Sequence, residues 1–151
     1  MDTLPDRDNE LEDNFPELLS GGGYSITSPK DVTYNCIGWA ADDKRWWWPD
    51  PLYQNYWPAE VPRVPTPEAF IMAYELIGYG VCQNSDFEEE YEKIAIYVKK
   101  STGEVTHASR QLDCSSWTSK CGVHHDISHE LNGLNSEAYS SPGIFMKRLK
   151  S

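Results

Sequence analysis

The chain has 151 residues, of which 39% are hydrophobic and 13% aromatic, a size and composition typical of one domain with a single core. Its formal net charge of -11 disfavours a nucleic-acid partner, because affinity for phosphate backbones requires lysine and arginine side chains. No apolar run is long enough to cross a bilayer, so we expect neither a membrane span nor a membrane partner.

Residues 1–23 are acidic and end in Ser-Gly-Gly-Gly, a composition that predicts a loosely ordered N-terminal arm. We expect one domain over residues 24–151. The arm lacks the basic and then apolar pattern of a secretory signal, which favours a cytoplasmic protein, although a specialised export route is compatible with the sequence. In that compartment the four cysteines are expected to be reduced, with disulfide pairing as the alternative.

The stretch from Tyr34 to Pro49 places one cysteine at the head of a short apolar segment. Turn formers followed by helix formers predict a helix that opens near Asn35 and runs to about Ala41. Cys36 would then lie in the first turn, where a helix N-terminus favours the thiolate and therefore a nucleophile. The alternative is a buried packing residue, since cysteine is among the most often buried residue types.

Residues 46–67 contain six prolines, which exclude a helix or a central strand and predict a long irregular loop. The loop is rich in large aromatic side chains that could form the wall of a substrate-binding cleft beside Cys36. The alternative is that they pin the loop onto the body of the protein. The candidates for substrate binding are Trp46, Trp47, Trp48, Tyr56 and Trp57.

A second helix is predicted after this loop, with Thr66 as its N-cap, Pro67 at its first position and Gly78 at its end. One face of this helix would be apolar, formed by Phe70, Ala73, Tyr74 and Ile77.

Alternating apolar residues predict a three-stranded antiparallel meander over residues 92–100, 104–112 and 117–122. Alternation places Ile94, Ile96 and Val98 on one face of the first strand. On the second strand it predicts a shared face for Val105, His107, Ser109 and Gln111.

Two further elements are expected after the meander. Residues 125–134 suit a short helix capped by Asp126. Residues 143–150 are interpreted as a last edge strand or a docked tail.

His107 is the candidate general base for a nucleophilic Cys36, because an imidazole beside a thiol lowers its pKa and accepts its proton. A third polar group would orient the imidazole. Gln111, Ser119 and Asn35 are the candidates, and nothing in the sequence chooses among them.

A second group of residues could serve as metal ligands. They are Cys114, Cys121, His124, His125 and His129. These residue types bind zinc, but their spacing matches no standard finger or ribbon. We therefore expect no metal and no cofactor, with a zinc-stabilised structural protein as an alternative.

The order of a cysteine helix and then an antiparallel meander resembles the papain-like superfamily, particularly its NlpC-type cell-wall peptidase branch. More specifically, the motifs resemble a family of small, mainly bacterial domains of unknown function. The motifs that carry the resemblance are Asn35–Cys36, Trp46–Pro49, Glu92–Ala95, Thr106–Ala108 and Trp117–Gly122.

This resemblance implies an α+β fold with a papain-like core, in which the helix bearing Cys36 packs on the sheet bearing His107. It also implies a cysteine hydrolase, an amidase or peptidase acting on a peptide, isopeptide or peptidoglycan amide. Cys36 would attack the carbonyl, His107 would relay the proton, and a backbone N–H at the head of the helix would hold the oxyanion.

One departure from the NlpC pattern concerns Lys93, which stands where that branch has its base histidine. A lysine cannot replace an imidazole base near neutral pH without a large shift of its pKa. Either His107 takes the base role from its own strand, or the chemistry is lost and the chain is a non-catalytic interaction module. In the second case the tryptophan-rich loop would contact a protein partner.

Overall fold

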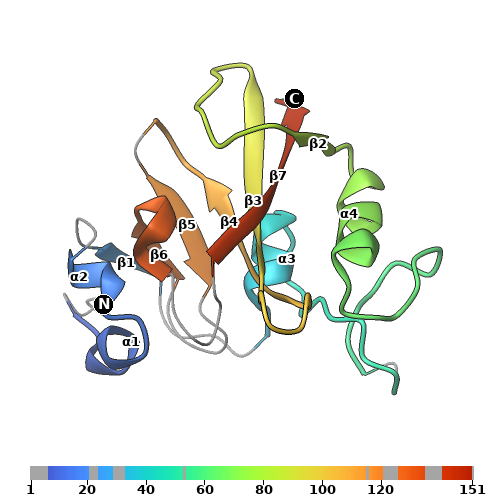
Figure 1. Ribbon diagram of the computed structural model, residues 1–151, viewed down its shortest axis with the longest axis horizontal. Coiled ribbons are helices and arrows are strands. Elements are labelled where there is room, and N and C mark those ends of the chain that lie inside the picture. Colours follow the sequence, from blue (N-terminus) through green and yellow to red (C-terminus); the bar gives the residue numbers. More distant parts are fainter. Residues whose placement is uncertain are drawn as a thin grey trace.

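The computed structural model describes residues 7–20, 24–28, 33–52, 54–114, 116–120, 126–134 and 141–150. Seven strands form one antiparallel sheet in the order β1-β6-β5-β4-β3-β7-β2 (Figure 1). The strands are β1 Tyr24–Ser28, β2 Gly80–Cys82, β3 Tyr91–Val98, β4 Val105–Gln111, β5 Trp117–Lys120, β6 Asp126–His129 and β7 Ser141–Leu149. The helices are α1 Asn9–Asn14, α2 Glu17–Ser20, α3 Cys36–Ala40, α4 Pro67–Glu75 and the 3₁₀ turn η1 Leu131–Leu134.

The expected α+β papain-like fold is wrong. The sheet dominates the described structure, and even α4, the longest of the described helices, has only nine residues. The predicted meander is present as the adjacent strands β3, β4 and β5, but further strands extend it on both sides. These additions make the fold mainly β.

The segment 125–134 accounts for part of this difference. Its described residues form β6 and then η1, where the sequence favoured one capped helix. β6 pairs with both β1 and β5, and its Ile127 is fully buried. Strand pairing and burial therefore outweigh the local capping preference of Asp126.

Strand β7 is also unlike its prediction, because it lies inside the sheet between β3 and β2. Its basic residues are accommodated by ion pairs with acidic residues of neighbouring segments. Lys147 Nζ lies 3.1 Å from Glu88, and Arg148 Nε lies 2.6 Å from Glu92. A charged sequence can therefore occupy an interior strand.

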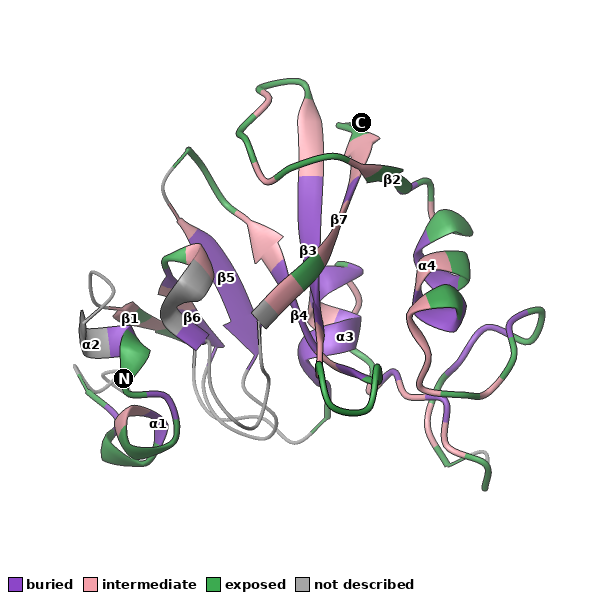
Figure 2. Cartoon of the chain, in the orientation of Figure 1, coloured by how far each residue is buried: buried purple, intermediate pink, exposed green. Residues whose placement is uncertain are grey.

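The two faces of the sheet carry separate hydrophobic clusters. Alternation along β3 sends Ile94 and Ile96 into the first cluster, with α3, α4 and the aromatic loop. It sends Ala95 and Tyr97 into the second, with α1, α2 and η1. Figure 2 shows the buried residues gathered on α3 and along β3, β4 and β5.

A register shift opposite Tyr97 and Val98 interrupts the alternation of β4. Because of it, Val105 and Ala108 both lie in the first cluster, whereas the His107 ring packs against Tyr97 on the other face. The expectation that Val105 and His107 share a face is therefore wrong.

The segment expected to form a loosely ordered arm contains α1 and α2. The N-cap of α1 is Asp8, whose side chain accepts hydrogen bonds from two backbone N–H groups. Leu11, Phe15 and Leu18 are buried in the second cluster. The helices α1 and α2 lie beside β1 at the left of Figure 1. Across the described ranges, no helix is both long and apolar enough to cross a bilayer.

Candidate functional site

Cys36 lies in the first turn of α3, as the sequence predicted, with Asn35 as the N-cap. Its side chain belongs to the first hydrophobic cluster, and the residue is only 7% exposed. Burial raises the pKa of the thiol to about 11, an effect that a hydrogen bond with the backbone of Ala108 offsets only in part. The neutral thiol therefore behaves as a packing group, and the setting does not favour a nucleophile.

His107 lies on the opposite face of the sheet from Cys36. Its ring meets Tyr97 edge to face at 4.9 Å, and its neighbour Ala108 is the residue that packs with Cys36. Burial also lowers the pKa of His107 well below its usual range. The structure thus does not bring the proposed nucleophile and base together.

Of the three candidates for a group that orients the His107 imidazole, only one is shown to contact it. Ser119 contacts His107, with 3.0 Å between Oγ and Nε2. Gln111 instead donates a hydrogen bond to the carbonyl of Ser85 at 2.8 Å, and Asn35 bonds to the backbone of Trp47.

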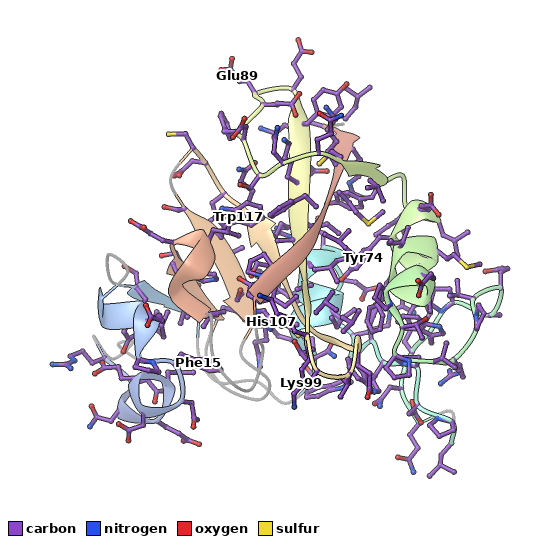
Figure 3. The ribbon with its side chains drawn as sticks, in the orientation of Figure 1. Phe15, Tyr74, Glu89, Lys99, His107 and Trp117 are labelled. Atoms are coloured by element: carbon purple, nitrogen blue, oxygen red, sulfur yellow. The ribbon has the colours of Figure 1, made fainter. Side chains whose placement is uncertain are left out.

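Ser119 also connects His107 to His129, which sequence reasoning considered only as a zinc ligand. His129 Nδ1 donates a hydrogen bond to the carbonyl of Glu130 at 2.5 Å. Its Nε2 therefore accepts a hydrogen bond from the Ser119 hydroxyl, with 2.7 Å between Nε2 and Oγ. Ser109 completes the group at 2.7 Å from Ser119. His107 and Trp117, which lie on neighbouring strands, are labelled in Figure 3.

The zinc alternative falls largely outside the described residues, which include neither Cys121 nor His124 and His125. Cys114 is exposed, and His129 is buried in a strand. Within the described ranges no group of three or more His, Cys, Asp or Glu side chains is arranged to hold a metal ion.

The aromatic side chains of the loop pack against α4. Trp48 and Trp57 both meet the ring of Phe70 edge to face, at 5.6 and 4.9 Å. Trp47 is also buried, and its ring stacks on Tyr74 at 6.3 Å. Trp46 and Tyr56 remain partly exposed. Most of the predicted substrate-binding aromatics therefore act in packing.

Side-chain hydrogen bonds support the described part of the loop backbone. Asp50 accepts from the backbone N–H groups of Gln54 and Asn55, at 2.7 and 3.0 Å. Arg63 donates to the carbonyls of Asp50 and Asn55, at 2.7 and 3.1 Å. An irregular loop is fixed in this way without helix or strand.

An open groove lies where this loop meets α3 and α4, and we call it the acidic groove. Its volume is about 330 Å³. Three carboxylates and one guanidinium are among the groups that line it, together with aromatic and apolar side chains. The lining residues are Ala41, Asp42, Asp43, Arg45, Trp47, Tyr56, Pro58, Glu60, Ala73, Leu76 and Ile77.

A cation already occupies part of the acidic groove. The Arg45 guanidinium lies 3.8 Å from the centre of the Tyr56 ring, and its Nη2 lies 2.6 Å from Asp43 Oδ2. This ion pair lowers the pKa of Asp43. A ring face beside a carboxylate is a favourable setting for a basic side chain.

Sequence reasoning found Trp47 and Tyr56 but missed the acidic members of the groove. Asp42 and Asp43 follow Ala41, the C-cap of α3, and precede the tryptophan run, and Asp42 has a positive φ of 58°. Asp is one of the few residues that tolerates this conformation, which reverses the chain after the helix. A pair of acidic residues between a helix and an aromatic loop is the signal that could have drawn attention to them.

A family described as a domain of unknown function (DUF7689) matches residues 25–147. No curated protein and no solved structure is significantly similar to the chain.

Proposed function

The chain belongs to this family of unknown function, and we propose that it is a non-catalytic binding module whose acidic groove receives a basic side chain of a partner protein. The observation that carries the proposal is the Arg45 guanidinium held between the Tyr56 ring and Asp43. The same two groups can receive a guanidinium from another chain.

Charge supports a basic ligand. Asp42, Asp43 and Glu60 outnumber Arg45 in the groove, and the whole chain carries a formal net charge of -11. A field of this sign attracts cationic segments and raises their rate of association.

A protein segment fits the groove better than a small metabolite, because the groove is open and its rim continues into exposed apolar side chains. On α4 and just beyond it, Met72 and Leu76 are 41% and 55% exposed. An apolar residue beside the basic one would cover them, as in peptide recognition by shallow grooves.

The fixed conformation of the loop supports recognition as well. Asn35, Asp50 and Arg63 hold its backbone before any ligand arrives. A surface that is already ordered loses little conformational entropy on binding, which favours affinity.

A hydrolase is less well supported, because Cys36 and His107 lie on opposite faces of the sheet and the thiol is buried and neutral. These two residues are therefore not placed as the nucleophile and base pair that acyl transfer requires.

The proposal can be tested by selecting ligands from a random dodecapeptide display library and measuring their affinity by fluorescence anisotropy. We expect enriched peptides to contain arginine or lysine beside an apolar residue. Glu60→Gln should weaken their binding roughly threefold. Arg45→Ala should strengthen it, because the intrachain competitor is removed while the Arg45 backbone N–H still bonds to Asp43.

Glu104→Gln is the matched control, since Glu104 is an exposed carboxylate that is not part of the groove. Enrichment of peptides without basic residues would contradict the proposal. So would an equal effect of Glu60→Gln and Glu104→Gln.

A further inference from the structure

A second groove adjoins the acidic groove and shares one residue with it, Asp42. Its volume is about 220 Å³, and its lining includes two cations, Arg110 and Lys150, beside the aromatic rings of Phe87 and Tyr91. It lies over the ends of β3 and β4, with Asp42 between the two grooves.

Arg110 has unused donors in this groove. In the part of the chain that the structure describes, its hydrogen bonds both come from Nη1, to the carbonyl of Trp39 at 3.3 Å and to Asp42 Oδ1 at 3.1 Å. The guanidinium carbon also lies 4.8 Å from the centre of the Trp39 ring. Nε and Nη2 can therefore donate to an incoming carboxylate in the paired geometry that arginine favours.

The carboxylates of the second groove are already paired with the chain's own cations. Asp42 bonds to Arg110, and Glu92 lies 2.6 Å from Arg148. Lys150 lies over the Phe87 ring at 5.6 Å, with its backbone fixed to the carbonyl of Glu90. The lining thus includes Lys150 as a second cation besides Arg110, and Phe87 adds exposed apolar surface.

We propose that the second groove is a carboxylate-binding subsite, so that one partner segment lies across both grooves with a basic residue in the first and an acidic residue in the second. This inference rests on the proposed function, because the same segment must occupy the acidic groove. The ion pair between the exposed Asp42 and the half-buried Arg110 marks the crossing point, where each member can also face a group of opposite charge on the ligand.

The test uses the peptides enriched from the dodecapeptide library. We expect them to carry a glutamate or aspartate at a constant spacing from the basic residue. Replacing that acidic residue by its amide in the peptide should weaken binding to the wild-type protein on the order of tenfold. The protein itself is unchanged in this measurement, so its folding is not affected.

The pairing is then assigned by a double-mutant cycle. Arg110→Gln should weaken binding of the acidic peptide by the same factor. It should have little further effect on the binding of the peptide in which that acidic residue is replaced by its amide. Lys150→Gln provides a second variant at an exposed position, for use if Arg110→Gln melts at a lower temperature. Lys100→Gln, in an exposed turn outside both grooves, is the charge-matched control and should leave affinity unchanged.

The outcomes separate the two proposals. Peptides that carry a basic residue but no acidic one, and that respond to Glu60→Gln, would overturn the second subsite and leave the binding function standing. The second subsite would also be overturned if the loss of affinity from the amide substitution in the peptide simply added to the loss from Arg110→Gln, and likewise to the loss from Lys150→Gln. Failure to enrich any basic peptide would overturn both.

Discussion

Asn35 holds the backbone of Trp47 with a pair of hydrogen bonds. Its Oδ1 accepts from the Trp47 N–H at 3.0 Å, and its Nδ2 donates to the Trp47 carbonyl at 2.7 Å. The same Oδ1 accepts from the N–H of Gly38 at 3.1 Å and so caps α3. One buried amide therefore starts the helix and also fixes the entry of the aromatic loop.

Asn35→Ala should lower the free energy of unfolding by about 2–4 kcal/mol, since it removes a cap and leaves the buried Trp47 backbone groups unpaired. Thr66→Ala is the control, because Thr66 caps α4 through one hydrogen bond, to the N–H of Ala69. It should cost about 1 kcal/mol. Urea denaturation of both variants checks this, and equal losses would show that the Trp47 contacts add nothing.

Gly38→Ala should be strongly destabilising, by about 3 kcal/mol or more, although alanine is the better helix former. A Cβ at this position would lie 2.1 Å from the carbonyl oxygen of Arg45, which cannot move without the loop. At Gly80 a Cβ meets nothing within 4 Å, so Gly80→Ala should be close to neutral. Thermal melting of the two variants compares them, and a tolerated Gly38→Ala would refute the close approach of the loop to α3.

Cys36 should resist alkylation by iodoacetamide in the native protein. Its pKa of about 11 leaves roughly one thiol in ten thousand ionised at pH 7, and burial blocks the reagent. The exposed Cys114 should react first, and Cys36 should react after unfolding in urea. Peptide mapping by mass spectrometry distinguishes the two, and comparable native rates would revive the nucleophile hypothesis.

Stability should fall as the pH is lowered from about 6.5 towards 4. Burial lowers the pKa of His129 from 6.5 to about 4, so the unfolded chain takes up a proton that the folded protein does not. At pH 5 this proton uptake lowers the free energy of unfolding by about 2 kcal/mol relative to neutral pH. The lowered pKa of His107 acts in the same direction.

Urea denaturation at pH 7.5, 6 and 5 measures the effect of these two histidines. His129→Gln removes one titrating group and should therefore lose less stability over this interval. A wild-type protein that is equally stable at pH 7.5 and 5 would contradict the buried neutral state of both imidazoles.

Local signals predicted part of the fold. The caps Asn35 and Thr66 begin α3 and α4, and the alternating pattern found β3, β4 and β5. The sequence could not indicate β2, which has only three residues, because so short a run has no recognisable period. It also misassigned β6, where pairing with two distant strands decides the conformation.

The candidate site shows the same limit. The sequence places Cys36 in a helix and His107 on a strand, but a pattern of alternation does not say which face of the sheet the helix will cover. Packing of α3 against β4 and β5 determines which face the helix covers. As a result, Cys36 lies on one face of the sheet and His107 on the other. The acidic groove likewise depends on long-range packing, because Tyr56, Asp43 and Leu76 come from three separate segments.

The interior position of β7 has a consequence for the order of folding. A ribosome makes β2 and β3 before β7, yet β7 supplies the hydrogen bonds that join them into one sheet. Until β7 inserts, one side of β3 and all of β2 are open edges, which readily pair with other chains. A late insertion of this kind closes long loops and slows folding. Nascent chains interrupted before β7 should therefore aggregate and depend on chaperones.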